Sequence, residues 1–276
     1  MANNLERQTV LIAGLPGKVA TLVAEGIDST RDLRVYPFAL SSEGHAKPGA
    51  FSVIGTRPIS LVSPVAHEHM VEKVRQLKGI VVDFTRPDVA NRNAELYTEV
   101  GVPFVMGTSG GDREKLLDTV KRSKVSAVIA PNMATPMVVI QAMLEFAAQT
   151  FPGALTGYEL SITESHQATK KDVSGTAKAW RPILEALGGV MEEDIDSIRD
   201  QDEQMDVFRV VNLDAHAYHY IDLISPDGMT KILLSTKIDG RSVYVGGTLQ
   251  AIRFLRDKIQ AGSQGEVFSM IDVLKG

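Results

Sequence analysis

The sequence predicts an α/β protein in which a doubly wound parallel sheet is accompanied by a smaller α+β domain. Two observations support this fold class. Short apolar strands alternate with amphipathic helices between residues 9 and 130, as in a parallel sheet covered by helices on both faces. Strand-like runs at 204–211, 216–225 and 231–238, the last two separated by the turn sequence Pro226-Asp227-Gly228, are typical of an antiparallel sheet.

The composition excludes several classes of protein. The 276 residues are 44% hydrophobic and 23% charged, which is usual for a soluble globular protein of one large or two ordinary domains. A net charge of −5 gives no electrostatic reason to expect nucleic acid or an anionic membrane as a partner. No apolar run is long enough to cross a membrane, and the N-terminus has no secretory signal pattern. The absence of cysteine rules out disulfides and suits a reducing compartment.

The first unit begins with an apolar run at residues 9–13, a turn from Gly14 to Gly17, and a helix-like segment to about Gly26. A strand, a glycine turn and a helix open the Rossmann-like folds, where the glycines admit a pyrophosphate to the helix N-terminus. The spacing Gly-x-x-Gly-x-x-Ala lacks the middle glycine of the usual motif. A purely structural turn therefore remains an equal alternative.

The second strand, residues 33–40, ends at Ser41-Ser42 instead of the acidic residue that binds a free ribose 2′-hydroxyl. Because no carboxylate repels it, a 2′-phosphate is tolerated there, and the two hydroxyls together with Lys18 can help to bind it. The sequence therefore favours NADPH over NADH. Residues 43–58 are expected to form a loop or a hairpin.

Strands and helices continue to alternate, and the loops after the strands are candidate sites because ligands bind at the carboxyl ends of parallel strands. Two loops stand out, Asp83-Phe84-Thr85-Arg86-Pro87 and Gly107-Thr108-Ser109-Gly110-Gly111, with ordinary capped turns as the alternative. The expected strands cover residues 79–83, 103–106 and 126–130. One expected helix ends near residue 77, and two more cover residues 88–100 and 111–121.

One stretch of the second domain combines three kinds of functional group. Alternation from Tyr158 to Glu164 predicts a strand, after which His166 offers a group that titrates near neutrality. Lys170 follows four positions later, on the same face if this stretch is helical. Ser174-Gly175-Thr176 precedes a helix over 177–187, whose N-terminus attracts anions. Together these groups favour an acidic small molecule, although a helix cap, a structural histidine and a solvated lysine are the alternatives.

The rest of the chain gives weaker signals. His67 and His69 fit a solvated helix start better than a metal site. His216 and His219 point to opposite faces of a strand and make a poor metal pair. Arg241 is either a carboxylate ligand or a surface charge. The expected helices of this part cover residues 135–149 and the segment that follows Gly246-Gly247-Thr248 to about residue 259.

Several of these motifs, taken together, resemble dihydrodipicolinate reductase, also called 4-hydroxy-tetrahydrodipicolinate reductase, and most closely its plant-type branch. The resemblance extends over nearly the whole chain. The sequences that carry it are Asp83-Phe84-Thr85-Arg86-Pro87, Val102 to Arg113, Glu164-Ser165-His166-Gln167-Ala168-Thr169-Lys170, Asp172-Val173-Ser174-Gly175-Thr176-Ala177, and Met270-Ile271-Asp272-Val273-Leu274.

The resemblance implies a dinucleotide-binding domain at residues 1–130, completed by 241–276, and an inserted α+β domain at 131–240 that binds substrate and forms a homotetramer through its sheet. It implies hydride transfer from NADPH or NADH to a cyclic dicarboxylate in lysine biosynthesis. We expect a cytoplasmic location, or the plastid stroma if a transit peptide has been removed.

The resemblance also implies roles for individual residues. His166 is expected to protonate a ring carbon and to act with Lys170 in catalysis. The substrate carboxylates are assigned to Lys170, Ser174, Gly175, Thr176 and Arg241. The coenzyme is assigned to Gly14, Gly17, Lys18, Val19, Ser41, Ser42, Thr85, Arg86, Gly107 and Thr108, and no metal is expected.

The chain departs from the common family pattern at three places. Gln167 replaces a second histidine, Val173 replaces a pair such as Ala-Pro, and Val19-Ala20 replaces Met-Gly. Two other functions remain open: reduction of another cyclic imine or enamine acid, and a non-catalytic binding or assembly role for the same fold.

Overall fold

A computed structural model describes residues 7–276, and the chain within it forms two compact units. Unit 1 combines the chain up to Thr135 with Ser242–Gly276, and unit 2 is Pro136–Arg241. The sequence analysis placed these divisions at residues 130 and 240. Most of the N-terminal segment, which shows no secretory signal pattern, lies outside the described residues.

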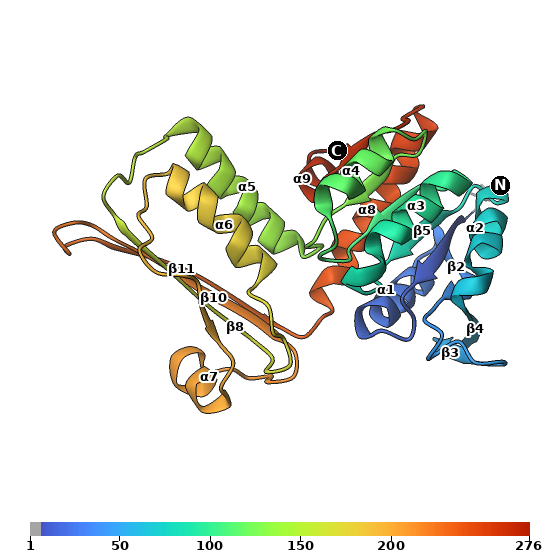
Figure 1. Ribbon diagram of the computed structural model, residues 1–276, viewed down its shortest axis with the longest axis horizontal. Coiled ribbons are helices and arrows are strands. Elements are labelled where there is room, and N and C mark those ends of the chain that lie inside the picture. The colour runs from blue at the N-terminus through green and yellow to red at the C-terminus, as the bar shows by residue number, and fades with distance from the viewer. Residues whose placement is uncertain (1–6) are drawn as a thin grey trace. The chain divides into compact units, whose positions relative to one another are not determined.

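Unit 1 contains an eight-stranded sheet that is parallel except for one edge hairpin (Figure 1). This sheet bears out the predicted α/β class. The strands are β1 (Gln8–Ala13), β2 (Leu33–Leu40), β3 (Phe51–Ile54), β4 (Arg57–Val62), β5 (Ile80–Asp83), β6 (Phe104–Met106), β7 (Ala127–Ile129) and β12 (Val267–Phe268). Their order is β12-β7-β6-β5-β1-β2-β4-β3, and the antiparallel pair β3–β4 is the hairpin alternative predicted for residues 43–58.

Helices cover this sheet, and its central strands are buried as an apolar core. The helices are α1 (Lys18–Asp28), α2 (His67–Gln76), α3 (Ala90–Val100), α4 (Arg113–Lys121), α8 (Val243–Gln260) and α9 (Met270–Lys275), with 3-10 turns at Pro64–Ala66 and Pro87–Val89. Helices α2, α3 and α4 share one core cluster with Leu11 and Val81, whereas α1 packs with α8. The C-terminal segment therefore belongs structurally to unit 1.

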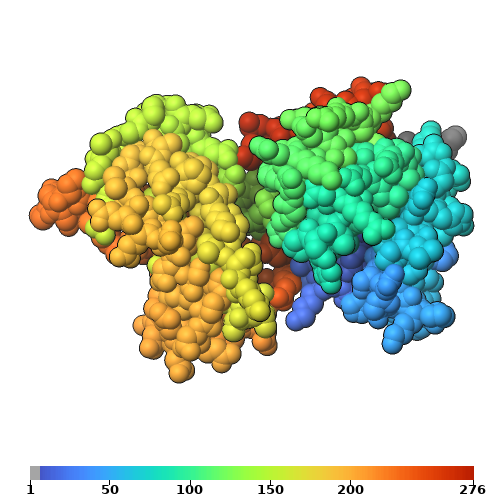
Figure 2. All heavy atoms as spheres, in the orientation of Figure 1, coloured from blue at the N-terminus to red at the C-terminus, as the bar shows by residue number. Residues whose placement is uncertain are grey.

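Unit 2 contains a four-stranded sheet with helices on both sides. Its elements are α5 (Thr135–Thr150), β8 (Glu159–His166), α6 (Gly175–Ala186), β9 (Asp196–Ile198), α7 (Gln201–Phe208), β10 (His216–Ile224) and β11 (Lys231–Asp239). The order is β11-β10-β8-β9, antiparallel except for the pair β8–β9. Figure 1 shows α5 and α6 on one side of this sheet and α7 on the other, and Figure 2 shows the same segments as filled atoms.

The predicted strand at Tyr158–Glu164 is confirmed as β8, and its alternation decides which side chains are buried. Leu160, Ile162 and Glu164 are each exposed by 2% or less. They lie opposite Leu223, Ile221 and His219 of β10, so that a carboxylate is carried into the same buried layer as two apolar residues.

Residues 204–211 were expected to form a strand, and this prediction was wrong, because α7 occupies 201–208. Asp200 caps this helix, since its side chain accepts hydrogen bonds from the backbone N–H groups of Asp202 and Glu203. Gln204 and Phe208 are buried four residues apart, and Phe208 packs against Tyr218. The cap and this spacing of four are helical signals.

Two further expectations are corrected. Gly246 and Gly247 lie inside α8 instead of before it, and a side chain at Gly247 would meet the Met133 carbonyl oxygen at 2.0 Å. Glycine is therefore required there by a close approach of backbone. The stretch joining His166 to Lys170 is the end of a strand followed by a turn, in which the Lys170 N–H donates to the Gln167 carbonyl at 2.9 Å, so the helical relation between the two residues does not hold.

Candidate active site

The polar network of unit 2 is centred on a residue that the sequence analysis assigned to no role, Glu164 of β8. Its side chain is fully buried, and its Oε1 accepts hydrogen bonds from the Ser197 hydroxyl at 2.7 Å and the Ser174 N–H at 3.2 Å. Burial raises the pKa of this carboxyl, but hydrogen bonds from His166, Arg199 and Ser197 outweigh that effect and hold the pKa well below its usual range. Glu164 therefore remains a carboxylate at neutral pH.

His166, the predicted proton donor, is the last residue of β8 and is held by this carboxylate. Its Nδ1 lies 2.6 Å from Glu164 Oε2, and its side chain is 13% exposed. Because Nδ1 bonds to the carboxylate, Nε2 is the ring nitrogen that remains for a ligand. The arrangement is that of an imidazole oriented by an acidic neighbour.

Arg199 follows β9 and was missed by the sequence analysis. Its Nη2 lies 2.6 Å from Glu164 Oε1, and its Nη1 lies 3.1 Å from Oε2, which makes a two-point ion pair. The same guanidinium donates to the carbonyls of Lys170 at 2.9 Å and Asp172 at 3.2 Å. The local sequence Ser-Ile-Arg-Asp gives no signal for this role, because the contacts join residues far apart in the chain.

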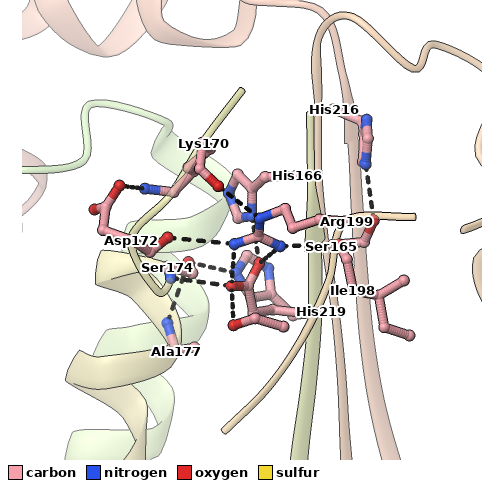
Figure 3. A network of polar contacts seen from close by, with 12 residues as sticks. Ser165, His166, Lys170, Asp172, Ser174, Ala177, Ile198, Arg199, His216 and His219 are labelled. Atoms are coloured by element: carbon pink, nitrogen blue, oxygen red, sulfur yellow. Dashed lines mark hydrogen bonds and ion pairs between the residues drawn. The ribbon is translucent and has the colours of Figure 1, made fainter. Parts of the chain in front are cut away.

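Lys170 lies in the loop between β8 and α6, as Figure 3 shows. Its Nζ is 2.8 Å from Asp172 Oδ1, and the two side chains are 21% and 74% exposed. The hydrogen bond from Lys170 lowers the pKa of Asp172. The Lys170 ammonium therefore belongs to the loop that follows His166, and the exposed carboxylate of Asp172 is its present partner.

The predicted anion site at Ser174-Gly175-Thr176 is the N-terminus of α6, as expected. The Ser174 hydroxyl, however, turns inward: it accepts a hydrogen bond from the Ala177 N–H at 3.4 Å and lies 2.8 Å from His219 Nε2. Apart from the residues next to Gly175 and the nearby backbone of α6, no atom of the described chain lies within 4 Å of the position that a Gly175 side chain would take. Backbone N–H groups of the first turn are therefore better placed than the Ser174 hydroxyl to meet an anion.

Two buried histidines flank this network on opposite faces of the sheet, as predicted. Burial lowers the pKa of His219 to about 4, and the neighbouring His166 ring, whose centroid is 5.6 Å away, acts in the same direction. His216 bonds to Ser165 on the other face, and burial lowers its pKa as well. Arg241 does not join the described network, and its Nη2 donates to the Asp214 carbonyl at 3.3 Å.

The glycine turn of unit 1 joins β1 to α1 and approaches the backbone at Phe84 closely. Gly14 has φ = +113°, and a side chain there would lie 2.4 Å from the Phe84 carbonyl oxygen. Gly17 precedes α1, which begins at Lys18 and Val19 and has neither an acidic residue in its first turn nor a side-chain cap. This helix N-terminus therefore suits the pyrophosphate of a dinucleotide.

A second buried carboxylate, Asp83 at the end of β5, joins the two predicted loops of unit 1. Its Oδ1 accepts hydrogen bonds from the hydroxyls of Thr85 at 2.6 Å and Thr108 at 2.7 Å. Its Oδ2 accepts from Tyr97 and Asn93, each at 2.8 Å. Burial, followed by the charge of Asp83, raises the pKa of the Tyr97 hydroxyl well above its usual value. The sequence analysis noted Asp83 only as part of a motif.

The other predicted residues of these loops are placed differently. A side chain at Gly107 would meet the Phe84 ring at 2.2 Å, so any larger residue would force that ring to move. Arg86 is exposed and forms an ion pair with Asp88. The chain thus brings Gly107, Thr85 and Thr108 together around Asp83 and leaves the Arg86 side chain at the surface.

At the end of β2 only one of the two predicted serines is accessible. The buried Ser41 hydroxyl donates to the Leu15 carbonyl at 2.5 Å, whereas Ser42 is exposed and lies 3.0 Å from His45 Nδ1. His67 begins α2, as expected, but its side chain is half-buried, and its Nε2 lies 3.1 Å from the carbonyl oxygens of both Ser41 and Val62.

Among residues 7–276, no group of three or more His, Asp or Glu side chains is placed to hold a metal ion. Among the helices of the described chain, none is both long and apolar enough to cross a membrane.

Models of the two halves of one protein family match almost the whole chain. The model for the dihydrodipicolinate reductase N-terminus matches residues 8–133, and the model for the C-terminus matches residues 136–274.

Individual proteins agree with these matches. A chloroplastic 4-hydroxy-tetrahydrodipicolinate reductase 1 of Arabidopsis thaliana is 39% identical over 97% of this chain and 78% of its own length. A 4-hydroxy-tetrahydrodipicolinate reductase of Methanothermobacter thermautotrophicus is 34% identical over 71% of this chain and 72% of its own. The dipicolinate-bound dihydrodipicolinate reductase of Paenisporosarcina sp. TG-14 shares the fold, with a TM-score of 0.64 and 18% identity over 96% of this chain and 98% of its own.

Proposed function

This chain belongs to the dihydrodipicolinate reductase family, and on that premise we propose that it reduces 4-hydroxy-tetrahydrodipicolinate to tetrahydrodipicolinate with NADPH or NADH, in lysine biosynthesis. The observation that carries the proposal is the His166 imidazole held by the Glu164 carboxylate beside Lys170 and the start of α6.

His166 is proposed to be the general acid. Loss of the 4-hydroxyl group as water gives the substrate ring a C=C–C=N system. When bound, the reduced nicotinamide would supply a hydride to a carbon of this system, whose electron pair moves to nitrogen and leaves an enamine anion that must take up a proton on carbon. His166 Nε2 donates that proton. The Nδ1 proton stays on the Glu164 side, so the ring is left as one defined neutral tautomer.

Positive groups are proposed to hold the two carboxylates. Lys170 supplies an ammonium, and the first turn of α6 at Gly175 and Thr176 supplies backbone N–H groups. Ser174 is proposed to support substrate binding by capping α6 with its hydroxyl group, which is also bonded to His219. Arg241 is proposed as a further carboxylate ligand, with the Asp214 carbonyl as its present partner.

The proposed coenzyme contacts lie in unit 1, at the turn before α1 and in the loops after β5 and β6. Gly14, Gly17, Lys18 and Val19 hold the pyrophosphate at the start of α1, which has no acidic residue to repel it. The nicotinamide and its ribose are proposed to lie beside the loops that carry Thr85, Arg86, Gly107 and Thr108. NADPH is the proposed coenzyme, since Ser41 and Ser42 follow β2 in place of a carboxylate.

A homotetramer formed through the sheet of unit 2 is also proposed. Its edge strand β11 exposes 42% of Ile232 and 56% of Leu233, which gives apolar area for assembly. Light scattering after size-exclusion chromatography measures the mass, and a monomer would contradict this assembly. The protein is proposed to work in the cytoplasm or the plastid stroma, which subcellular fractionation would distinguish.

The test is a coupled assay. The preceding synthase makes the substrate from pyruvate and aspartate semialdehyde, and the loss of NADPH or NADH absorbance is followed after adding the protein. Rapid oxidation is expected, faster with NADPH. If both coenzymes bind and neither is oxidised, the alternatives apply: reduction of another cyclic imine or enamine acid, or a non-catalytic binding or assembly role.

The proposed acid is tested in the same assay by His166→Gln. We expect kcat to fall about 100-fold, with the Kd of the coenzyme unchanged, because general acid catalysis contributes about 100-fold or more. His69→Gln is the matched control, since His69 is exposed on α2. Wild-type turnover by His166→Gln would remove His166 from the mechanism.

A further inference from the structure

We infer that Glu164 and Arg199 form a positioning clamp that fixes the acid, the ammonium and the start of α6 in one arrangement. This inference rests on the proposed function and adds to it two residues that do not touch the substrate. Glu164 acts through His166 and Ser174, and Arg199 acts through the loop that carries Lys170 (Figure 3).

The Glu164 half of the clamp joins two elements. Its two oxygens divide their partners: Oε2 takes the His166 ring nitrogen at 2.6 Å, and Oε1 takes the Ser174 N–H at 3.2 Å. His166 ends β8 and Ser174 caps α6, so a single carboxylate sets the distance between the proposed acid and the proposed anion site. The side chain has no exposed surface, so water does not compete for these bonds.

The Arg199 half fixes the loop between those elements. Its guanidinium makes five hydrogen bonds in the structure, to both Glu164 oxygens and to the carbonyls of Lys170, Asp172 and Ile198. These use the whole donor capacity of an arginine. Two of the bonds hold the backbone on both sides of residue 171, so the stem of Lys170 is fixed even though its ammonium is partly exposed.

The geometry requires an arginine at this position. A lysine supplies one compact donor group and cannot reach two carboxylate oxygens and three carbonyls at once. A clamp of this kind does not change the chemistry of His166 or Lys170. The clamp restricts His166, Lys170 and the start of α6 to one arrangement before the substrate binds. Its loss should therefore affect substrate affinity and rate together.

The test compares Arg199→Ala, Arg199→Lys and the control Arg181→Ala. Arg181 is an arginine of α6 that pairs with Glu185 at 2.9 Å and lies apart from the clamp. We expect kcat/KM to fall about 100-fold in both Arg199 variants, through a raised KM as well as a lowered kcat, and to remain at the wild-type value in Arg181→Ala. The Kd of NADPH should be unchanged in all three.

A positioning role is separated from a merely structural one by chemical rescue. Guanidinium ion, at concentrations that leave the melting temperature unchanged, should restore part of kcat/KM in Arg199→Ala and none in Arg199→Lys, where the ammonium fills the site. Wild-type kinetics in Arg199→Ala would overturn the clamp. A loss that guanidinium does not restore, accompanied by a lower melting temperature, would reduce Arg199 to a structural role and overturn it as well.

Two further measurements test the clamp even if Arg199→Ala folds poorly or the chain does not catalyse the proposed reaction. The double variant Glu164→Gln/Arg199→Met leaves no unpaired buried charge, and it should lose as much kcat/KM as Arg199→Ala because the pair acts as one unit. Wild-type activity in it would contradict the clamp. Calorimetric binding of dipicolinate, a planar dicarboxylate probe, needs no turnover. Arg199→Ala should bind it about tenfold more weakly than wild type, and equal binding would count against the clamp even if the chain proved not to be this reductase.

Discussion

Lowering the pH should destabilise unit 2 through His219, a buried imidazole of β10. Only 1% of this residue is exposed, and its ring nitrogens lie 2.8 Å from the Ser174 hydroxyl and 3.1 Å from the Thr236 hydroxyl. Burial, and then repulsion from the His166 ring, lower the pKa of His219 from 6.5 to about 4, against the attraction of Glu164. The folded state therefore holds this ring neutral.

The sign and size of the effect follow from this difference. Because the pKa of His219 is lower in the folded chain, the unfolded chain takes up the proton first as the pH falls. Stability is complete above pH 6.5 and is lost as the pH falls towards 4. At about 1.4 kcal/mol per unit of pKa difference, the loss is about 2 kcal/mol at pH 5 and about 3 kcal/mol once the folded state also titrates.

The chain contains its own probe for this measurement. Trp180 is the only tryptophan, is fully buried on α6, and has its ring centroid 6.0 Å from that of His219. Its fluorescence therefore reports the unfolding of unit 2. Urea unfolding at pH 7 and at pH 5 should show that His219→Gln loses about 2 kcal/mol less than wild type between the two values. His69→Gln, the same substitution at an exposed site, should follow wild type.

An equal loss in His219→Gln and wild type would refute the reasoning, since the proton uptake would then belong to another group. His216 would then be the strongest candidate, because burial also lowers its pKa and it lies on the opposite face of the same strand.

Three other substitutions probe the remaining site geometry. Asp83→Asn sets an amide against hydrogen-bond donors in a buried pocket, so unit 1 should lose about 3 kcal/mol in hydrogen-exchange measurements, and an unchanged value would contradict the role of the carboxylate. Gly107→Ala pushes a methyl group against the Phe84 ring and should cost about 1–3 kcal/mol and weaken NADPH binding; a coenzyme Kd equal to that of wild type would argue against this contact. Asp172→Ala frees Lys170 from an exposed ion pair, so stability should stay within about 0.5 kcal/mol while KM falls by up to about fivefold, and a raised KM would show that Asp172 assists binding.

Local patterns in the sequence determined much of the fold. Alternation identified β8, the turn residues identified the hairpin of β10 and β11, and the glycine turn identified the entry to α1. Such features depend on residues close together in the chain, whose spacing directly reflects strand or helix periodicity. Residue types and a helix-cap pattern identified the stretch with His166, Lys170 and the start of α6 as a candidate site, but the helical relation expected between His166 and Lys170 was wrong. The prediction failed at α7, where the helix signals, an Asp200 cap and the spacing of Gln204 and Phe208, were read as a strand.

Only the tertiary structure decided how the sites are held together. Glu164 meets Arg199 across 35 residues, and the sheet register that pairs β8 with β9 brings them together. Asp83 and Tyr97 meet because a strand and a helix pack side by side. No periodicity marks such partners, since a buried carboxylate takes whichever donors the packing brings to it. The sequence by itself identified groups suited to chemistry, and the packing determined which of them, like the Ser174 hydroxyl, are already bound within the protein.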